Sequence, residues 1–209
     1  MARTRRELLS AARHQVALVG LRDLNVTDVA REAGVSVGTM YRHFPAKHEL
    51  LAEIVDDICG HEREIVAKVA ADGDDPAARL AAAVRCFAER AVASGRVAYA
   101  VIAEPAPAEI EAERLAHRRA LADIFGEIIA DGVAADVDRG RFPDQDPAIS
   151  SAAIVGAVSE VLVGPLAPAR RDGVDIDAVL AATVAFVLRG IVGIVGDDAP
   201  APPTEEEHP

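Results

Sequence analysis

The chain has 209 residues, of which 51% are hydrophobic and 27% are charged, and its formal net charge is −12. This composition excludes an intrinsically disordered chain and allows one or two packed domains. The charge is uneven, because the first 50 residues carry 8 basic and 5 acidic side chains, a formal +3, whereas the remainder carries −15. Such a split is typical of a small segment that faces a polyanion, attached to an acidic body.

Apolar residues recur with a helical period along the chain, and no run alternates as a strand would. We therefore predict an all-α fold of roughly nine helices. The two short ones lie between residues 26 and 44, and the others are expected at about residues 3–19, 46–71, 77–93, 97–103, 109–131, 147–162 and 176–195. The last residues, DDAPAPPTEEEHP (197–209), are predicted to be a disordered acidic tail.

The segment AVLAATVAFVLRGIVGIVG (178–196) is apolar enough to be considered as a membrane span. Arg189 inside it and acidic residues at both ends argue against that interpretation. An all-round apolar helix must still be covered, and two such helices at the C-terminus favour a four-helix bundle with a second copy over a monomeric core. The N-terminal MARTRRELL lacks the features of a secretion signal, and we expect a cytoplasmic protein with reduced Cys59 and Cys86.

The stretch VTDVAREAGVSVGTMYRHF has the pattern of two short helices joined by a tight turn. Thr27 is a candidate N-cap of the first helix, and Gly34 can adopt the left-handed conformation that ends it. Ser36 is expected to cap the second helix, which buries Met40. This pattern is typical of a helix-turn-helix, whose second helix enters the major groove of DNA.

The longer run VTDVAREAGVSVGTMYRHFPAKHELL resembles the N-terminal DNA-binding signature of TetR-family transcriptional regulators. The likeness covers about residues 5–55 and rests on the Ala-Gly-Val-Ser turn, the Tyr-x-x-Phe pair and the Lys-x-x-Leu pair. It implies a three-helix DNA-binding head at residues 1–48 and a helical ligand-binding and dimerisation domain at residues 49–196.

The resemblance also implies roles for side chains of the head, and their chemistry allows these roles. Arg42 is the best candidate to hydrogen-bond guanine. The base edges would be met by Val37, Gly38, Thr39 and Arg42. Phosphates would be held by Thr27, Ser36, Tyr41, His43 and Lys47. Arg3, Arg5 and Arg6 either reach the flanking DNA backbone or minor groove, or form a solvated chain end.

A ligand pocket is implied among the middle helices, with large side chains forming an apolar wall. The candidate lining residues are Phe87, Tyr99, Ile102, His117, Leu121, Phe125 and Glu160. Further candidates for polar anchors are Cys86, Glu104 and Arg118. Glu160 has an alternative role, which is to pair with Arg189 across a dimer interface.

Enzyme and metal chemistry find little support in the sequence. Cys59, His61 and Glu62 are close together, but no second ligand pair at zinc spacing accompanies them. The chain has no glycine-rich phosphate loop and no nucleophile elbow. We therefore predict no metal, no cofactor and no enzymatic activity.

Together these interpretations predict a sequence-specific, homodimeric transcriptional regulator. We expect a repressor that binds a palindromic operator in double-stranded DNA and leaves it when a small, largely apolar ligand binds. The alternative is a helical ligand-binding or interaction protein with a non-functional helix-turn-helix. The net charge of −12 and the few polar residues on the second helix favour that alternative.

Overall fold

The protein is described by a computed structural model that covers residues 2–135 and 141–193. The described residues form nine α-helices and no strand, as the all-α prediction requires. These are α1 (Ala2–Val19), α2 (Val26–Glu32), α3 (Val37–His43), α4 (Lys47–Ala70), α5 (Pro76–Ser94), α6 (Arg96–Ala103), α7 (Ala108–Ala135), α8 (Pro147–Val163) and α9 (Ile176–Ile191). The predicted tail and the expected last residues of the final helix lie outside the described residues.

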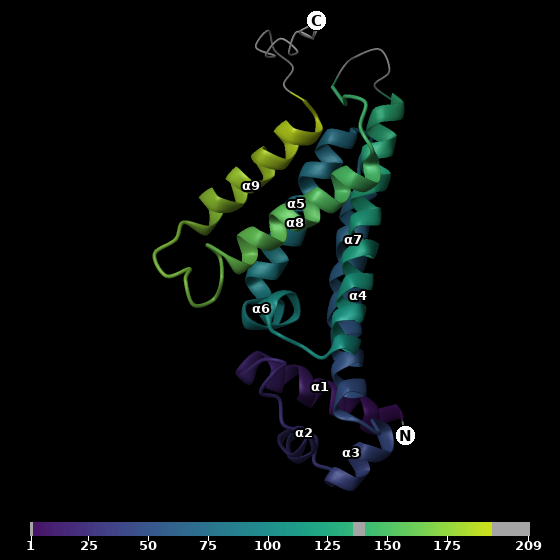
Figure 1. Cartoon of the computed structure of the whole chain (residues 1–209), viewed down its shortest axis with the longest axis vertical. Coiled ribbons are helices and arrows are strands. Elements are labelled where there is room, and N and C mark those ends of the chain that lie inside the picture. The colour runs from purple at the N-terminus through teal and green to yellow at the C-terminus, as the bar shows by residue number, and fades with distance from the viewer. Residues whose placement is uncertain (1, 136–140, 194–209) are drawn as a thin grey trace, which may run out of the picture.

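The helices form an elongated molecule with two distinct ends (Figure 1). Helices α1, α2 and α3 gather at one end and are called the head, and α4 to α9 are called the body. Helices α4 and α7 pack side by side along the length of the molecule, with α5 and α8 against them. Helix α6 contacts α1, so it lies where the body meets the head.

Local signals determine where α2 begins. The Asn25 side chain accepts a hydrogen bond from the Thr27 N–H at 2.8 Å, which makes Asn25 the N-cap. The expectation that Thr27 caps this helix is wrong, because Val26 is already helical and Thr27 lies within the first turn. Asp28, also in the first turn, complements the positive end of the helix dipole.

The turn between α2 and α3 follows the predicted pattern. Gly34 has a φ of +69°, a left-handed conformation that glycine adopts without strain. The Val35 N–H donates to the Ala30 carbonyl at 2.9 Å, which satisfies the last turn of α2. Ser36 caps α3 by accepting from the Thr39 N–H at 3.1 Å. The two short helices therefore end and begin at residues that the sequence marks.

Buried side chains form two cores. The head core lies between α1, α2, α3 and the first half of α4, and α6 and α7 add residues to it; its members include Leu8, Val16, Leu24, Val29, Met40, Phe44, Leu50, Ile54, Val101 and Ile110. Met40 and Phe44 are 0% and 1% exposed, as expected of core residues. The body core lies between α4, α5, α7, α8 and α9; its members include Val66, Leu80, Val84, Phe125, Ile128, Ile154, Val158, Leu180 and Val184.

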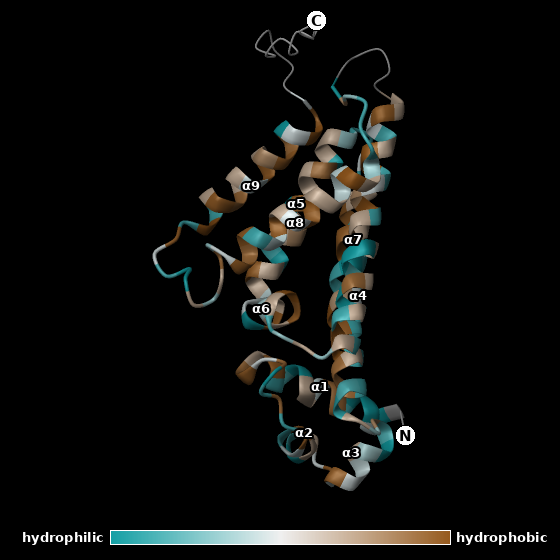
Figure 2. Cartoon of the chain, in the orientation of Figure 1, coloured by the Kyte–Doolittle hydropathy of each residue, from teal (hydrophilic) through white to brown (hydrophobic). Residues whose placement is uncertain are grey.

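Helices α8 and α9 are capped by Asp146 and Asp175, which accept from backbone N–H groups of their first turns. Each helix buries one side in the body core and leaves apolar residues exposed on another side. Figure 2 shows that hydrophobic residues, in brown, recur along both helices. Their large exposed hydrophobic side chains are Ile149, 69% exposed, and Phe186, 67% exposed. Among the described residues, no helix combines the length and the hydropathy needed to cross a membrane.

Candidate nucleic-acid interface and ligand cavity

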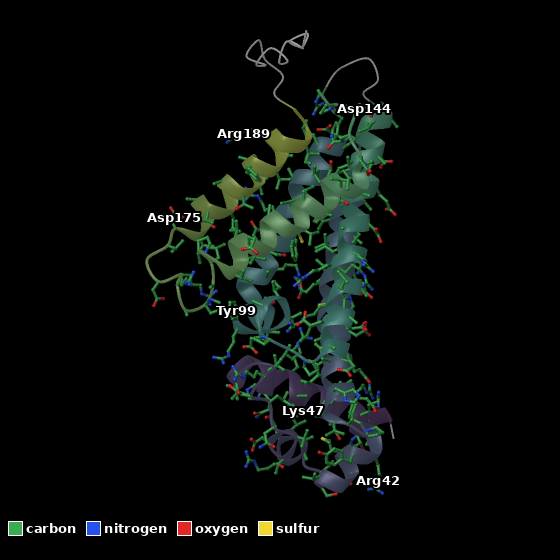
Figure 3. The ribbon with its side chains drawn as sticks, in the orientation of Figure 1. Arg42, Lys47, Tyr99, Asp144, Asp175 and Arg189 are labelled. Carbon is green, nitrogen blue, oxygen red and sulfur yellow. The ribbon has the colours of Figure 1, made fainter. Side chains whose placement is uncertain are left out.

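The candidate DNA-contacting residues lie on α3 and at the neighbouring ends of α2 and α4 (Figure 3). Arg42 projects at the end of the molecule that is farthest from the body. The exposed members of the candidate set are Thr27, Ser36, Gly38, Tyr41 and Arg42, and the partly buried members are Val37, Thr39, His43 and Lys47. The head therefore presents a contiguous group of mostly polar residues to solvent.

A chain of hydrogen bonds holds the polar side of α3. The Ser36 and Thr39 hydroxyls lie 2.9 Å apart, and Arg42 Nη2 donates to Thr39 Oγ1 at 2.8 Å. These contacts reduce the rotamer freedom of the Arg42 guanidinium before any partner arrives. The remaining Arg42 donors have no partner among the described residues, so they are available to an external acceptor.

Arg5 has a structural role that the sequence does not reveal. Its guanidinium forms a bidentate ion pair with Glu53 of α4 and donates to the His43 carbonyl at 2.8 Å. It also lies 4.3 Å from the centre of the Phe44 ring. These contacts hold Arg5 between α1, α3 and α4 and give it a structural role, whereas its contact with flanking DNA stays a prediction. Arg3, by contrast, makes only an exposed pair with Glu7.

A cavity of about 80 Å³ lies between α4, α5, α6, α7 and α8. Its apolar wall consists of Val66, Phe87, Val101, Ile102, Leu121 and Val155. Its polar wall consists of Cys59, Glu62, Arg63, Arg114, His117, Arg118 and Ser159. This volume is below the roughly 300–1,000 Å³ of pockets that hold small organic ligands, but four of the lining residues also line a neighbouring surface groove of about 650 Å³.

Four of the seven predicted lining residues line this cavity: Phe87, Ile102, His117 and Leu121. The other three do not. Tyr99 lines a smaller cavity near Gly95, and Phe125 is fully buried in the body core. Glu160 is exposed and lines a surface groove beside the cavity. Among the weaker candidates, Arg118 lines the cavity and Cys86 packs against the body core instead.

Two cavity arginines, Arg63 and Arg114, are absent from the predicted set. Spacing along α7 gives a signal for one of them, because Arg114, Arg118 and Leu121 follow the three-and-four pattern of one helix face. Arg63 gives no comparable signal, since it follows Glu62 in a run of charged residues that reads as a solvated helix face. Only the packing of α4 against α7 turns it toward the cavity.

Arg114 is 3% exposed and is held by carbonyl groups of the body. Nη1 donates to the Glu104 carbonyl and Nη2 to the Ala100 carbonyl, both at 2.6 Å, and Nη1 also pairs with Glu111 at 2.7 Å. Its Nε is buried and has no hydrogen-bond partner. Burial lowers the pKa of Arg114 from its ordinary value, and the Glu111 carboxylate opposes that shift. The charge is therefore only partly compensated.

His117 is 9% exposed and connects α7 to α4. Arg63 Nη1 lies 3.1 Å from His117 Nδ1, and because a guanidinium can only donate, Nδ1 must accept. The ring proton then resides on Nε2, which lies 3.4 Å from carboxylate oxygens of Asp56 and Glu113. Side-chain atoms of these three residues lie within 4.8 Å of one another, but this tautomer leaves no lone pair on Nε2 for a metal ion.

Glu104 links the body to the head instead of entering the cavity. Its Oε2 accepts from the backbone N–H groups of Leu21 at 2.8 Å and Arg22 at 3.3 Å, in the turn between α1 and α2. Gly20 allows this approach, since it has a φ of +85° and a Cβ there would overlap the carboxylate. The Glu104 carbonyl, in turn, is held by Arg114 of the cavity wall. A continuous chain of contacts therefore runs from the cavity to the head.

Cys59 lies in the cavity wall and has no activating base. Burial raises the pKa of its thiol to about 12, so the reactive thiolate is scarce at neutral pH. Burial also raises the pKa of Cys86. At both cysteines burial outweighs the opposing effect of nearby arginines, so neither has the lowered pKa of a redox sensor.

Two family models match the sequence. Residues 8–54 match "Bacterial regulatory proteins, tetR family", and residues 73–163 match "Tetracyclin repressor-like, C-terminal domain". The first match covers the head and the start of α4, and the second covers the helices that enclose most of the cavity. Both parts of the chain therefore match models from one group of proteins.

Known relatives agree with these matches. The chain is 34% identical over 142 residues to "HTH-type transcriptional repressor KstR2" of Rhodococcus jostii (strain RHA1), a match that covers 66% of this chain and 67% of the relative. The fold is similar to that of the fatty acid degradation regulator FadR of Bacillus halodurans, with a TM-score of 0.74, 18% identity and coverage of 88% of this chain and 98% of the other. It is equally similar to FadR of Bacillus subtilis in complex with stearoyl-CoA, with a TM-score of 0.75, 18% identity and the same coverage of 88% and 98%. The chain therefore belongs to the TetR family of DNA-binding transcriptional regulators, which are not enzymes.

Proposed function

We propose that this protein is a repressor that binds a palindromic operator as a homodimer and leaves it when an effector enters the cavity. The observation that carries the DNA-binding half is the hydrogen-bonded row of Ser36, Thr39 and Arg42 on an exposed helix at the tip of the molecule. Arg42 would read guanine, with Val37, Gly38 and Thr39 beside it at base edges. Thr27, Ser36, Tyr41, His43 and Lys47 would hold phosphates.

The uncovered sides of α8 and α9 support the homodimer. Besides Ile149 and Phe186, their exposed residues include Ala152, Ala153, Gly156, Ala178, Ala181, Ala182 and Gly190. Small side chains allow close approach of helices, and an apolar surface of this kind is stabilised by burial against a second copy. In such a dimer the two α3 helices would be about 34–36 Å apart if they occupy successive major grooves.

The contacts from Arg114 through Glu104 to Leu21 support a response to ligand. An effector that binds better when the heads are at another separation lowers operator affinity by the same factor, by linkage. The proposed ligand has a largely apolar body, which matches the wall of Val66, Phe87 and Leu121. The Bacillus subtilis FadR structure, which contains stearoyl-CoA, supports a ligand of that apolar kind for a protein of this fold.

The first experiment is selection of binding sites from randomised duplex DNA with the wild-type protein and a Tyr41→Ala, Arg42→Ala double variant. The expected result is a palindromic motif for the wild type and its loss in the variant. Arg85→Ala removes a comparable exposed charge from the body and should select the wild-type motif. Lys47→Ala should lower affinity for all sequences and reduce the salt slope of binding by about one.

Failure can take three forms. If the wild type enriches no motif above the double variant, the DNA-binding proposal is wrong and the protein is a helical ligand-binding or interaction protein. If a motif is found but sedimentation gives a monomer on and off DNA, the homodimer is wrong. Operator binding that is unchanged by a panel of hydrophobic acids and acyl thioesters would contradict the ligand response.

A further inference from the structure

The charge around the cavity differs from the charge of the chain. The protein has a formal net charge of −12, yet three arginines line this cavity. Its one lining carboxylate, Glu62, is occupied by a bidentate pair with Arg90, whose Nη2 donates at 3.1 Å. The partner of Arg114, Glu111, does not line the cavity, and its side chain is 49% exposed. The lining itself therefore has an excess of positive charge.

The other two arginines have no ionic partner. Arg63 donates to the neutral ring of His117, and Arg118 donates to the Ile102 carbonyl at 3.0 Å. No carboxylate of the described residues lies within ion-pairing distance of either guanidinium. Asp56 and Glu113 face Nε2 of His117, on the opposite side of the ring from Arg63. At the cavity wall, therefore, the partly buried Arg63 and the exposed Arg118 have no carboxylate partner among the described residues.

Arg114 adds a buried donor that points to a ligand. Its Nε has no hydrogen-bond partner, although the side chain is 3% exposed and each of its other two nitrogens has at least one. A buried donor without an acceptor costs about 1–3 kcal/mol, and protein structures retain few of them. An acceptor supplied by a ligand would remove that cost.

We propose, on the basis of the ligand response above, that the effector is an amphipathic anion whose acidic group lies between Arg63, Arg114 and Arg118. Its apolar body lies against Val66, Phe87 and Leu121, which line the same cavity. Entry is from the groove between α6, α7 and α8, because Ile102, Arg118, Val155 and Ser159 line both the groove and the cavity.

Two sources supply this chemistry, and they place the charge differently. A free hydrophobic carboxylic acid brings its charge into the cavity. A coenzyme A thioester has no charge at its acyl carbonyl, and its phosphates would lie outside, in the groove that contains Arg119. Arg63, which has no carboxylate partner, and Arg114, whose Nε has no acceptor, favour the acid, because both residues line the cavity and neither lines the groove.

The test measures binding directly and needs no DNA. Anilinonaphthalene sulfonate is an anionic fluorophore, and phenylnaphthylamine has the same ring system without the charge. We expect the wild-type protein to bind the anion about 10- to 100-fold more tightly than the neutral probe, as charge-assisted hydrogen bonds would provide. Decanoate should displace the anionic probe at lower concentration than methyl decanoate or decanoyl-CoA.

The variants locate the charge. Arg63→Gln should remove most of the preference for the anion while leaving the affinity for phenylnaphthylamine unchanged. Arg119→Gln is the matched control, because Arg119 is an exposed arginine on α7 that lines the groove and not the cavity. This variant should leave the affinity for both probes unchanged. Circular dichroism of each variant verifies that the helices are retained.

Three results would overturn the proposal. The first is equal affinity for the charged and neutral probes, or no binding of either. The second is an anion preference that survives Arg63→Gln. The third is tighter binding of decanoyl-CoA than of decanoate with sensitivity to Arg119→Gln, which would place the charge in the groove. If the anion binds as expected but operator affinity does not change, the ligand response fails while the anion site stands.

Discussion

The head and the body of this protein differ in where their function is specified. The head depends on neighbours in sequence, since Asn25, Gly34 and Ser36 determine the ends of two short helices and present α3. The body depends on long-range packing, because its cavity collects side chains from five helices. A short sequence motif is therefore enough to identify what the head does. The ligand chemistry of the body, by contrast, depends on which charged side chains the packing brings together.

The largest effects should come from removing one phenylalanine from each core. Phe44→Ala in the head and Phe125→Ala in the body should each cost about 3–5 kcal/mol of unfolding free energy, because both rings are completely buried. Denaturant unfolding measures the cost. Phe44→Ala should weaken DNA binding more than ligand binding in the cavity. Phe125→Ala should weaken ligand binding more than DNA binding. Loss of both activities together in each variant would show that the two cores unfold as one unit.

The next effect concerns the link between head and body. Glu104→Ala removes the acceptor for the Leu21 and Arg22 N–H groups and should lower stability by about 1–3 kcal/mol. It should also reduce the change in operator affinity that a ligand produces. Glu104→Gln retains an acceptor oxygen and should lose less stability and less of the ligand response. Thermal unfolding measures the stability, and DNA titration with and without ligand measures the response. An unaltered ligand response in Glu104→Ala would exclude this contact as the coupling route.

A smaller effect should separate the structural arginine from those that meet DNA. Arg5→Lys keeps the charge but loses the planar fork on Glu53, so a loss of about 1 kcal/mol in stability is expected. The salt slope of DNA binding should not change. Arg3→Lys is the control, since the Arg3 side chain is 86% exposed and stability should stay constant. Arg5→Ala removes the charge, and a reduced salt slope of DNA binding in that variant would show that Arg5 contacts phosphate.

The smallest effect is chemical rather than energetic. Because burial raises the pKa of Cys59 to about 12, its alkylation by iodoacetamide should be slow at pH 7 and still accelerating at pH 10. Mass spectrometry of the labelled peptides measures the rate, with denatured protein as the reference. Fast labelling at pH 7 in the folded protein would contradict the burial of this thiol. A cavity ligand should slow the reaction further.

The sequence was sufficient to predict the helices and the helix-turn-helix, because those depend on local signals. Capping residues, a left-handed glycine and apolar spacing act over a few residues. They can therefore be recognised without knowledge of the rest of the chain. The one error there, Thr27 in place of Asn25 as the cap, arose because both residues can accept the same kind of hydrogen bond.

Tertiary structure alone decided the roles of the charged residues. From the sequence, Arg5 is a candidate for contact with DNA, but in the structure α4 places Glu53 beside it. From the sequence, Glu104 is a candidate ligand anchor, but in the structure it accepts from the turn after α1. Arg63 has the sequence surroundings of a solvated helix residue, but in the structure it donates to His117 of α7. A long charged side chain has no fixed partner in sequence, so its function is determined by which element packs against it.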